Sequence, residues 1–214
     1  MKHEIGKECP RHYKEGWPGM LGGFSHFEFT PGVPQALCLI TTRKENGKAN
    51  AAYHAWQCFT GSGKAYYIIV AGLTVNGHTY KSMRREGAFC VNFLGAQHHA
   101  ACMKTIEVNG EENDELLDAG LTGEAAKEVS APRVEEAFLS YECVFEKAHT
   151  LDGMDDTALV IGRVVHAAVR EGFSTPASIC APDGFLMNIV GPIDPLTGEN
   201  SQSCVASLKI EPQL

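Results

Sequence analysis

Two segments of the chain, residues 50–56 and 79–85, carry side chains suited to holding a flat, phosphorylated ligand. Residues 50–56 are small and polar where a buried strand normally carries Val and Ile. Small side chains let an aromatic ring approach the backbone, whose N–H and C=O groups then pair with the ring's polar edge. Thr79 stands at the start of a predicted short helix, and the N–H groups and dipole of a helix start attract phosphate. Residues 81–85 add positive charge, and the Ser82 hydroxyl is a further donor.

Each segment also has a plainer explanation. Residues 50–56 are compatible with a strand that faces water on one side. The segment around Thr79 is compatible with an ordinary capped surface helix. From the residues alone, both alternatives stay open.

Other motifs that suggest chemistry are incomplete. His98 and His99 are adjacent, so on a helix they point about 100° apart and converge poorly on a metal. The remaining ligands of a zinc site are absent, so no metal is expected. The Gly61–Lys64 stretch is a poor P-loop, because Cys58 and Ala65 occupy positions that need Gly and Ser or Thr.

Composition narrows the class of protein. The chain has 214 residues, 44% of them hydrophobic, and a net charge of −8, so it has no basic excess for a nucleic-acid surface. No apolar run is long enough for a membrane span, and the start of the chain does not resemble a signal segment. The eight cysteines form no CxxC pair. We therefore expect a cytoplasmic protein with free thiols that binds neither nucleic acid nor membrane.

The elements that must position these residues are mostly strands. Alternating and β-branched patterns predict strands at 35–42, 50–59, 64–71, 88–94, 138–149 and 157–170. Shorter helical patterns lie at 78–86, 97–106, 111–117 and 124–129, and Gly87 fits a left-handed helix cap. Many strands with few helices favour a barrel, which hides strand edges. We expect an N-terminal arm at 1–30, a barrel domain at 31–190 and a C-terminal tail at 191–214.

The order and spacing of several segments resemble the flavin reductase-like FMN-binding split barrels, a family that includes flavoredoxin. These segments are residues 36–56, 77–93, 120–122, 131–143 and 159–165. The resemblance implies a mainly β fold, an antiparallel six-stranded Greek-key split barrel with a few short peripheral helices. It also implies FMN as cofactor and a homodimer with FMN near the subunit interface.

The same resemblance implies which residues approach the flavin. Asn50 and Trp56 match family positions near the ring, and His78 and Thr79 match the helix start that binds the FMN phosphate. Tyr53, His54, Gln57 and Ser82 complete the expected cofactor-binding set.

Two positions depart from the family pattern. Glu115 stands where members often carry Lys, and Thr157 stands where many carry His. Both changes remove donor groups from the expected rim of the cofactor site.

The function implied by the resemblance is an NAD(P)H-dependent flavin oxidoreductase that transfers hydride to FMN. Because the flavin supplies the redox chemistry, no catalytic triad is expected. Two alternatives stay open: a flavoredoxin-type electron carrier that works with a redox-protein partner, and a non-redox barrel that binds another small ligand.

Overall fold

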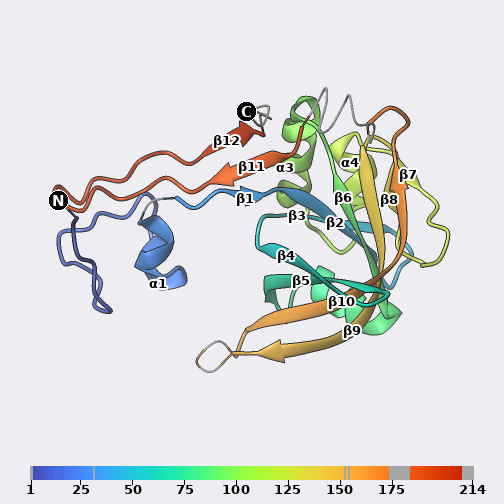
Figure 1. Cartoon of the computed structure of the whole chain (residues 1–214), viewed down its shortest axis with the longest axis horizontal. Helices are drawn as coiled ribbons and strands as arrows, with labels where there is room; N and C mark the ends of the chain where they lie inside the picture. The colour runs from blue at the N-terminus through green and yellow to red at the C-terminus, as the bar shows by residue number, and fades with distance from the viewer. Residues whose placement is uncertain (1, 31, 152, 154, 174–183, 209–214) are drawn as a thin grey trace. The chain divides into compact units, whose positions relative to one another are not determined.

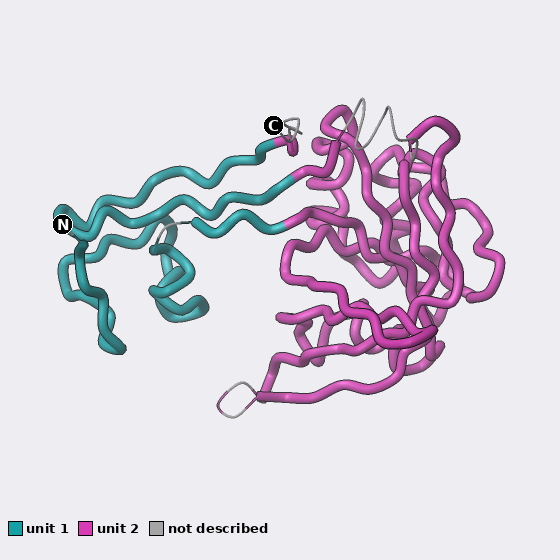
Figure 2. Tube along the Cα trace, in the orientation of Figure 1, with its two compact units in different colours: residues 1–35, 187–206 teal, residues 36–186, 207–214 magenta. Residues whose placement is uncertain are grey.

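The computed structural model describes residues 2–30, 32–151, 153, 155–173 and 184–208. The chain divides into two compact units, residues 1–35 with 187–206 and residues 36–186 with 207–214 (Figure 2). Cys180 and the end of the expected tail, residues 209–214, lie outside the described residues.

The larger unit is built on one antiparallel sheet of seven strands in the order β3-β2-β6-β9-β10-β5-β4 (Figure 1). The strands are β2 (Cys38–Arg43), β3 (Ala49–His54), β4 (Gln57–Ser62), β5 (Ala65–Thr74), β6 (Ala88–Phe93), β9 (Leu139–Thr150) and β10 (Thr157–Val169). Every residue of β6 is buried, and β2 is buried except at its last residue. Central strands buried on both faces explain the continuous apolar runs in the sequence.

Both edges of this sheet come from one stretch of chain. The single strand expected over residues 50–59 is in fact two strands, β3 and β4, joined through Ala55 and Trp56. The Trp56 ring lies against Gly72, where a Cβ atom would come within 2.4 Å of it. This packing turns the chain from one edge of the sheet to the other. Because the expected strand is divided in two, the sheet has seven strands rather than six. Among the described residues no ladder joins β3 to β4, so the sheet stays open between its two edges.

The expected fold class is confirmed: the protein is mainly β, with a few short helices beside the sheet. These helices are α2 (His78–Glu86), η2 (Ala96–His98), α3 (His99–Glu107) and α4 (Glu115–Ala119). Gly87 ends α2 in the predicted left-handed conformation at φ 66°, with its N–H bonded to the Met83 carbonyl. The helix expected over 124–129 is wrong. That segment begins in a short strand, β7 (Gly123–Glu124), which pairs with β8 (Arg133–Val134).

A buried carboxylate explains why residues 125–129 do not form a helix. Glu142 is fully buried and accepts the backbone N–H groups of Lys127 and Glu128. Those N–H groups are therefore held by the sheet rather than by a helical turn. The Arg133 guanidinium lies 3.4 Å from the Glu142 carboxylate, which compensates the buried charge.

The smaller unit joins the two ends of the chain. Its helical turns are α1 (Met20–Gly23) and η1 (His26–Phe29), and its apolar cluster includes Met20, Phe29 and Ile193. The Ile193 N–H donates to the Phe29 carbonyl at 2.8 Å. The segments expected as an arm and a tail thus pack on each other, while the boundaries expected at 30/31 and 190/191 stay predictions. Strands β1 (Gln35–Ala36), β11 (Leu186–Ile189) and β12 (Cys204–Ser207) form a separate three-stranded sheet.

Candidate functional site

The start of helix α2 lies against the edge strand β3. The Asn50 side-chain N–H₂ donates to Thr79 Oγ1 at 3.0 Å and to Thr42 Oγ1 at 3.1 Å. All three side chains are buried. Because both protons of the Asn50 amide are used, this residue fixes the first turn of α2 to the β2–β3 hairpin.

This arrangement leaves the Thr79 hydroxyl proton available for another acceptor. Thr79 Oγ1 already accepts a proton from Asn50, so its own O–H points to a different partner. The residue also lies in the first turn of a nine-residue helix, where backbone N–H groups have no partner within the helix. Thr79 and Asn50 both line a cleft of about 240 Å³.

The walls of this cleft come from β3, α2, the end of β5 and the end of α3. The residues of β3 that line it are Asn50, Ala51, Ala52 and Tyr53. Two consecutive alanines keep this wall low, so a planar group can lie close to the strand. The Tyr53 hydroxyl lies 3.0 Å from His99 Nδ1, and burial raises the pKa of this phenol. Tyr53 therefore stays protonated at neutral pH.

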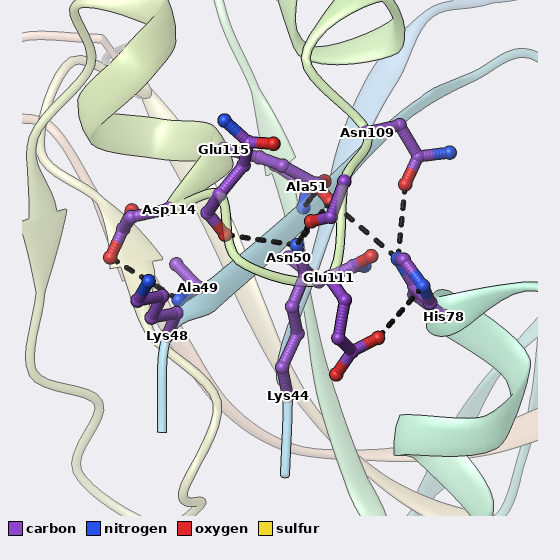
Figure 3. A network of polar contacts seen from close by, with 12 residues as sticks. Lys44, Lys48, Ala49, Asn50, Ala51, His78, Asn109, Glu111, Asp114 and Glu115 are labelled. Atoms are coloured by element: carbon purple, nitrogen blue, oxygen red, sulfur yellow. Dashed lines mark hydrogen bonds and ion pairs between the residues drawn. The ribbon is translucent and has the colours of Figure 1, made fainter. Parts of the chain in front are cut away.

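Lys44 forms a buried ion pair with Glu115, one of the residues that line the cleft (Figure 3). Lys44 Nζ lies 2.8 Å from Glu115 Oε1, and both side chains are only 1% exposed. Lys44 Nζ also donates to the carbonyls of Gly110 and Asn113, at 2.5 and 2.9 Å. The ammonium is therefore held by two carbonyl acceptors and by the charge of Glu115, in a place that solvent does not reach. Lys44 is thus a structural residue and is not available to a ligand phosphate.

Glu115 also holds the outer edge of β3. Its Oε2 atom accepts the Ala51 N–H at 2.6 Å, while the neighbouring Asp114 accepts the Ala49 N–H at 3.3 Å. Burial raises the pKa of the Glu115 carboxyl, and Lys44 and the Ala51 N–H offset only part of that rise. Glu115 stands where family members often carry a Lys donor. In this chain its carboxylate instead accepts a backbone N–H of the edge strand β3.

His78, the first residue of α2, contacts the loop that precedes α4. Its Nδ1 atom lies 3.1 Å from Asn109 Oδ1, and its Nε2 atom lies 3.0 Å from Glu111 Oε2 (Figure 3). His78 also lines a second cleft of about 270 Å³, together with Lys81, Ser82 and Arg85. His78 thus borders both clefts.

The remaining expected residues lie elsewhere. His54, Trp56 and Gln57 are at the corner between β3 and β4 and do not line the cleft around Thr79. Gln57 Nε2 donates to the Ala36 carbonyl at 2.6 Å, and burial lowers the pKa of His54. Thr157, the second position that departs from the family pattern, pairs with Thr74 across the sheet. Thr74 lines the cleft, so Thr157 lies at the rim of the cleft.

Sequence reasoning missed the part of the network that comes from the loop before α4. Asn109 falls between two expected helices, and the helix expected over 111–117 is wrong at its start, because α4 begins only at Glu115. The only local signal was the Asn109–Gly110 pair, which is typical of a turn. Lys44 was missed because a Lys beside an Asn-Gly hairpin is normally exposed.

The chain belongs to the flavin reductase-like domain family, whose model matches residues 30–185. It is 28% identical over 114 residues to FMN reductase (NADH) RutF of Agrobacterium fabrum. That match covers 53% of this chain and 62% of the relative, so the chain spans less than two thirds of the length of this curated relative.

Solved structures share the fold at low sequence identity. Nitrilotriacetate monooxygenase component B from Bacillus cereus has a TM-score of 0.75 at 20% identity, covering 99% of this chain and all of that one. A Shewanella frigidimarina protein described as a flavin reductase with a split barrel domain has a TM-score of 0.72 at 18% identity, covering 89% and 90%. Flavoredoxin of Desulfovibrio vulgaris has a TM-score of 0.66 at 20% identity, covering 86% and 92%. These likenesses show the split-barrel fold that the family resemblance predicts.

No helix in the described ranges combines the length and apolar character that crossing a membrane requires.

Proposed function

We propose that the protein binds FMN with its phosphate at the start of α2 and receives reducing equivalents from NADH or NADPH. The observation that carries this proposal is the Asn50–Thr79 hydrogen bond of 3.0 Å. It aligns a hydroxyl donor with the N–H groups of the same helix turn, and together they form a donor set for a phosphate dianion.

The size of the cleft says how much of a flavin it holds. Its volume of about 240 Å³ is below the range of about 300–1,000 Å³ typical of small-molecule sites. We therefore place the phosphate and its polyol chain in the cleft, with the ring system along the low wall of Ala51 and Ala52. A homodimer would cover the exposed face of the ring, in agreement with the expectation from the family.

Bound FMN supplies the chemistry, which is uptake of hydride at N5 of the ring system. The residues of the chain hold and orient it. Thr79 and the first turn of α2 bind the phosphate, Asn50 fixes that turn to the hairpin, and Ala51 and Ala52 leave room for a planar group. Tyr53 stays neutral at the wall, where its hydroxyl is hydrogen-bonded to the His99 ring. We propose that His54, Trp56, Gln57 and Ser82 support the site from the strand corner and the helix.

A flavin held at this site would, once reduced, supply electrons to a separate acceptor. The Bacillus cereus neighbour is named as one component of a monooxygenase, which supports an acceptor protein as a partner of this chain. Transfer to an acceptor would be the second step of the reaction, because the flavin would first have to be reduced.

The test is a pair of titrations followed by a reduction. Purified protein is titrated with FMN and with riboflavin, which lacks the phosphate, and the FMN-loaded protein is then mixed with NADH or NADPH. Hydrogen bonds to a charged group contribute about 1.5–3 kcal/mol, so FMN should bind roughly 10- to 100-fold more tightly than riboflavin. Equal affinity for the two flavins contradicts the phosphate site. Tight FMN binding with no bleaching by either nucleotide contradicts the reductase and supports the electron carrier.

A further inference from the structure

The contact between His78 and Glu111 is exposed, unlike the buried Lys44–Glu115 pair. Glu111 Oε2 lies 3.0 Å from His78 Nε2, yet the Glu111 side chain is 58% exposed. The backbone carbonyl of Glu111 accepts the Asn46 side-chain amide at 2.9 Å, so the main chain of the loop is anchored. The carboxylate is therefore free to rotate away while the loop stays in place.

His78 itself is held independently of Glu111. Its other ring nitrogen, Nδ1, lies 3.1 Å from Asn109 Oδ1 and 4.0 Å from Glu115 Oε1. These two contacts keep the ring in position when the Glu111 carboxylate leaves. Nε2 would then lose its carboxylate partner, and the protonated form of the ring would offer this N–H to an anion at the start of α2.

The charges around His78 favour an anion in that place. Lys81 and Arg85 line the same cleft as Glu111, although Arg85 also pairs with Glu86, whereas Lys44 is buried against Glu115 and donates to two carbonyls. Glu45 and Glu111 are the acidic residues that line this cleft. Because Glu111 is the one that contacts His78, and His78 borders both clefts, its carboxylate competes for the ring with a phosphate bound in the cleft around Thr79.

We propose that Glu111 is a specificity-determining residue: it holds His78 in the ligand-free protein and gives way to the phosphate of the flavin. The proposal rests on the proposed FMN site. It assigns His78 as a second phosphate-binding group beside Thr79. The phosphate competes with a carboxylate that is already present, so only a dianion attracted by the whole helix start displaces it. A flavin without phosphate leaves the Glu111–His78 contact unchanged.

Removal of the Glu111 charge therefore changes the affinity for one flavin and not for the other. An exposed ion pair contributes up to about 1 kcal/mol, so Glu111→Gln should bind FMN about 2- to 5-fold more tightly than the wild-type protein. Its affinity for riboflavin should stay the same. His78→Gln should weaken FMN binding, and Glu111→Gln in that background should have no further effect on FMN.

The experiment is isothermal titration of the full chain with FMN and with riboflavin, at one pH and one ionic strength. The matched control is Glu112→Gln, which removes the same charge from the next residue. Glu112 is 87% exposed and pairs with Lys48 rather than with His78. This control should leave both affinities unchanged.

The outcomes separate this inference from the proposed function. Wild-type protein that binds FMN no better than riboflavin overturns the phosphate site and the role of Glu111 with it. A clear preference for FMN that Glu111→Gln leaves unchanged overturns the role of Glu111 alone. The same gain in Glu112→Gln, or a gain that persists in the His78→Gln background, reduces the effect to general charge and also overturns it.

Discussion

Two glutamates at the two ends of one short loop segment have opposite surroundings. Glu115 is 1% exposed and contacts the Lys44 ammonium and the Ala51 N–H, whereas Glu111 is 58% exposed and its carboxylate contacts the His78 ring. Both lie beside the start of α2, and both carry the same functional group. The difference between them is burial.

Burial decides which of the two pairs builds the fold and which is available to a ligand. Removing one partner of a buried ion pair leaves an uncompensated charge in a poorly solvated place. Water replaces a lost partner at an exposed pair with little change in free energy. Glu115 therefore belongs to the framework that holds β3 and α4 together, and Glu111 lies on the exposed side, where we propose that the ligand binds.

The sharpest way to break this comparison is Glu115→Ala. It leaves the Lys44 ammonium buried with only two carbonyl acceptors, so the free energy of unfolding should fall by about 3–5 kcal/mol. Urea denaturation of both proteins measures the loss. Glu112→Ala is the matched control, because this exposed side chain should change stability by less than about 0.5 kcal/mol. Similar effects of the two variants would mean that burial does not distinguish these glutamates.

The next effect in size concerns the ligand-facing side. Thr79→Val keeps the shape of the side chain but removes the hydroxyl that Asn50 aligns, so FMN affinity should fall about 10- to 100-fold. Fluorescence titration measures this, with riboflavin as the reference ligand, whose affinity should not change. Thr79→Ser restores the hydroxyl and should restore FMN binding. Undiminished FMN uptake by the Val variant would place the phosphate elsewhere.

Much of this framework was predictable because the signals are local. The strand patterns, the helix at 78–86 and its Gly87 cap each depend on residues close together in the chain. Asn50 and Thr79 were singled out separately, and the structure joins them by one hydrogen bond. Their role toward a flavin stays a prediction.

The parts that were missed depend on contacts between distant residues. Gly72 is a recognisable breaker, but nothing local says that the Trp56 ring packs on it and divides one expected strand into two. Lys44 and Glu115 look like surface charges until the fold buries them together. Charged residues are rarely this buried, so a pattern-based analysis places them outside by default.

The pH dependence of stability sharpens the comparison further. Burial raises the pKa of Glu115 above its ordinary value of 4.5, so the folded protein binds this proton more tightly than the unfolded chain does. The contribution of this group to stability is present below pH 4.5 and is lost as the pH rises through the raised pKa. As the pH rises over that range, we expect the wild-type protein to lose stability relative to Glu115→Gln. Urea denaturation at a series of pH values measures it, and a difference that shifts toward the wild type would show that Lys44 favours the charged form.

The smallest expected effect is on stability in Glu111→Gln. Asn109 still holds the His78 ring in this variant, and water replaces the carboxylate, so the free energy of unfolding should change by about 0.2–1 kcal/mol. Urea denaturation in the absence of flavin measures it beside Glu112→Gln. A loss as large as that of Glu115→Ala would make the Glu111–His78 contact part of the fold. A phosphate would not displace a contact of that strength, because the free energy lost with the contact would offset the free energy gained from binding. A small loss is therefore a physical condition for Glu111 to act as an exchangeable partner of His78.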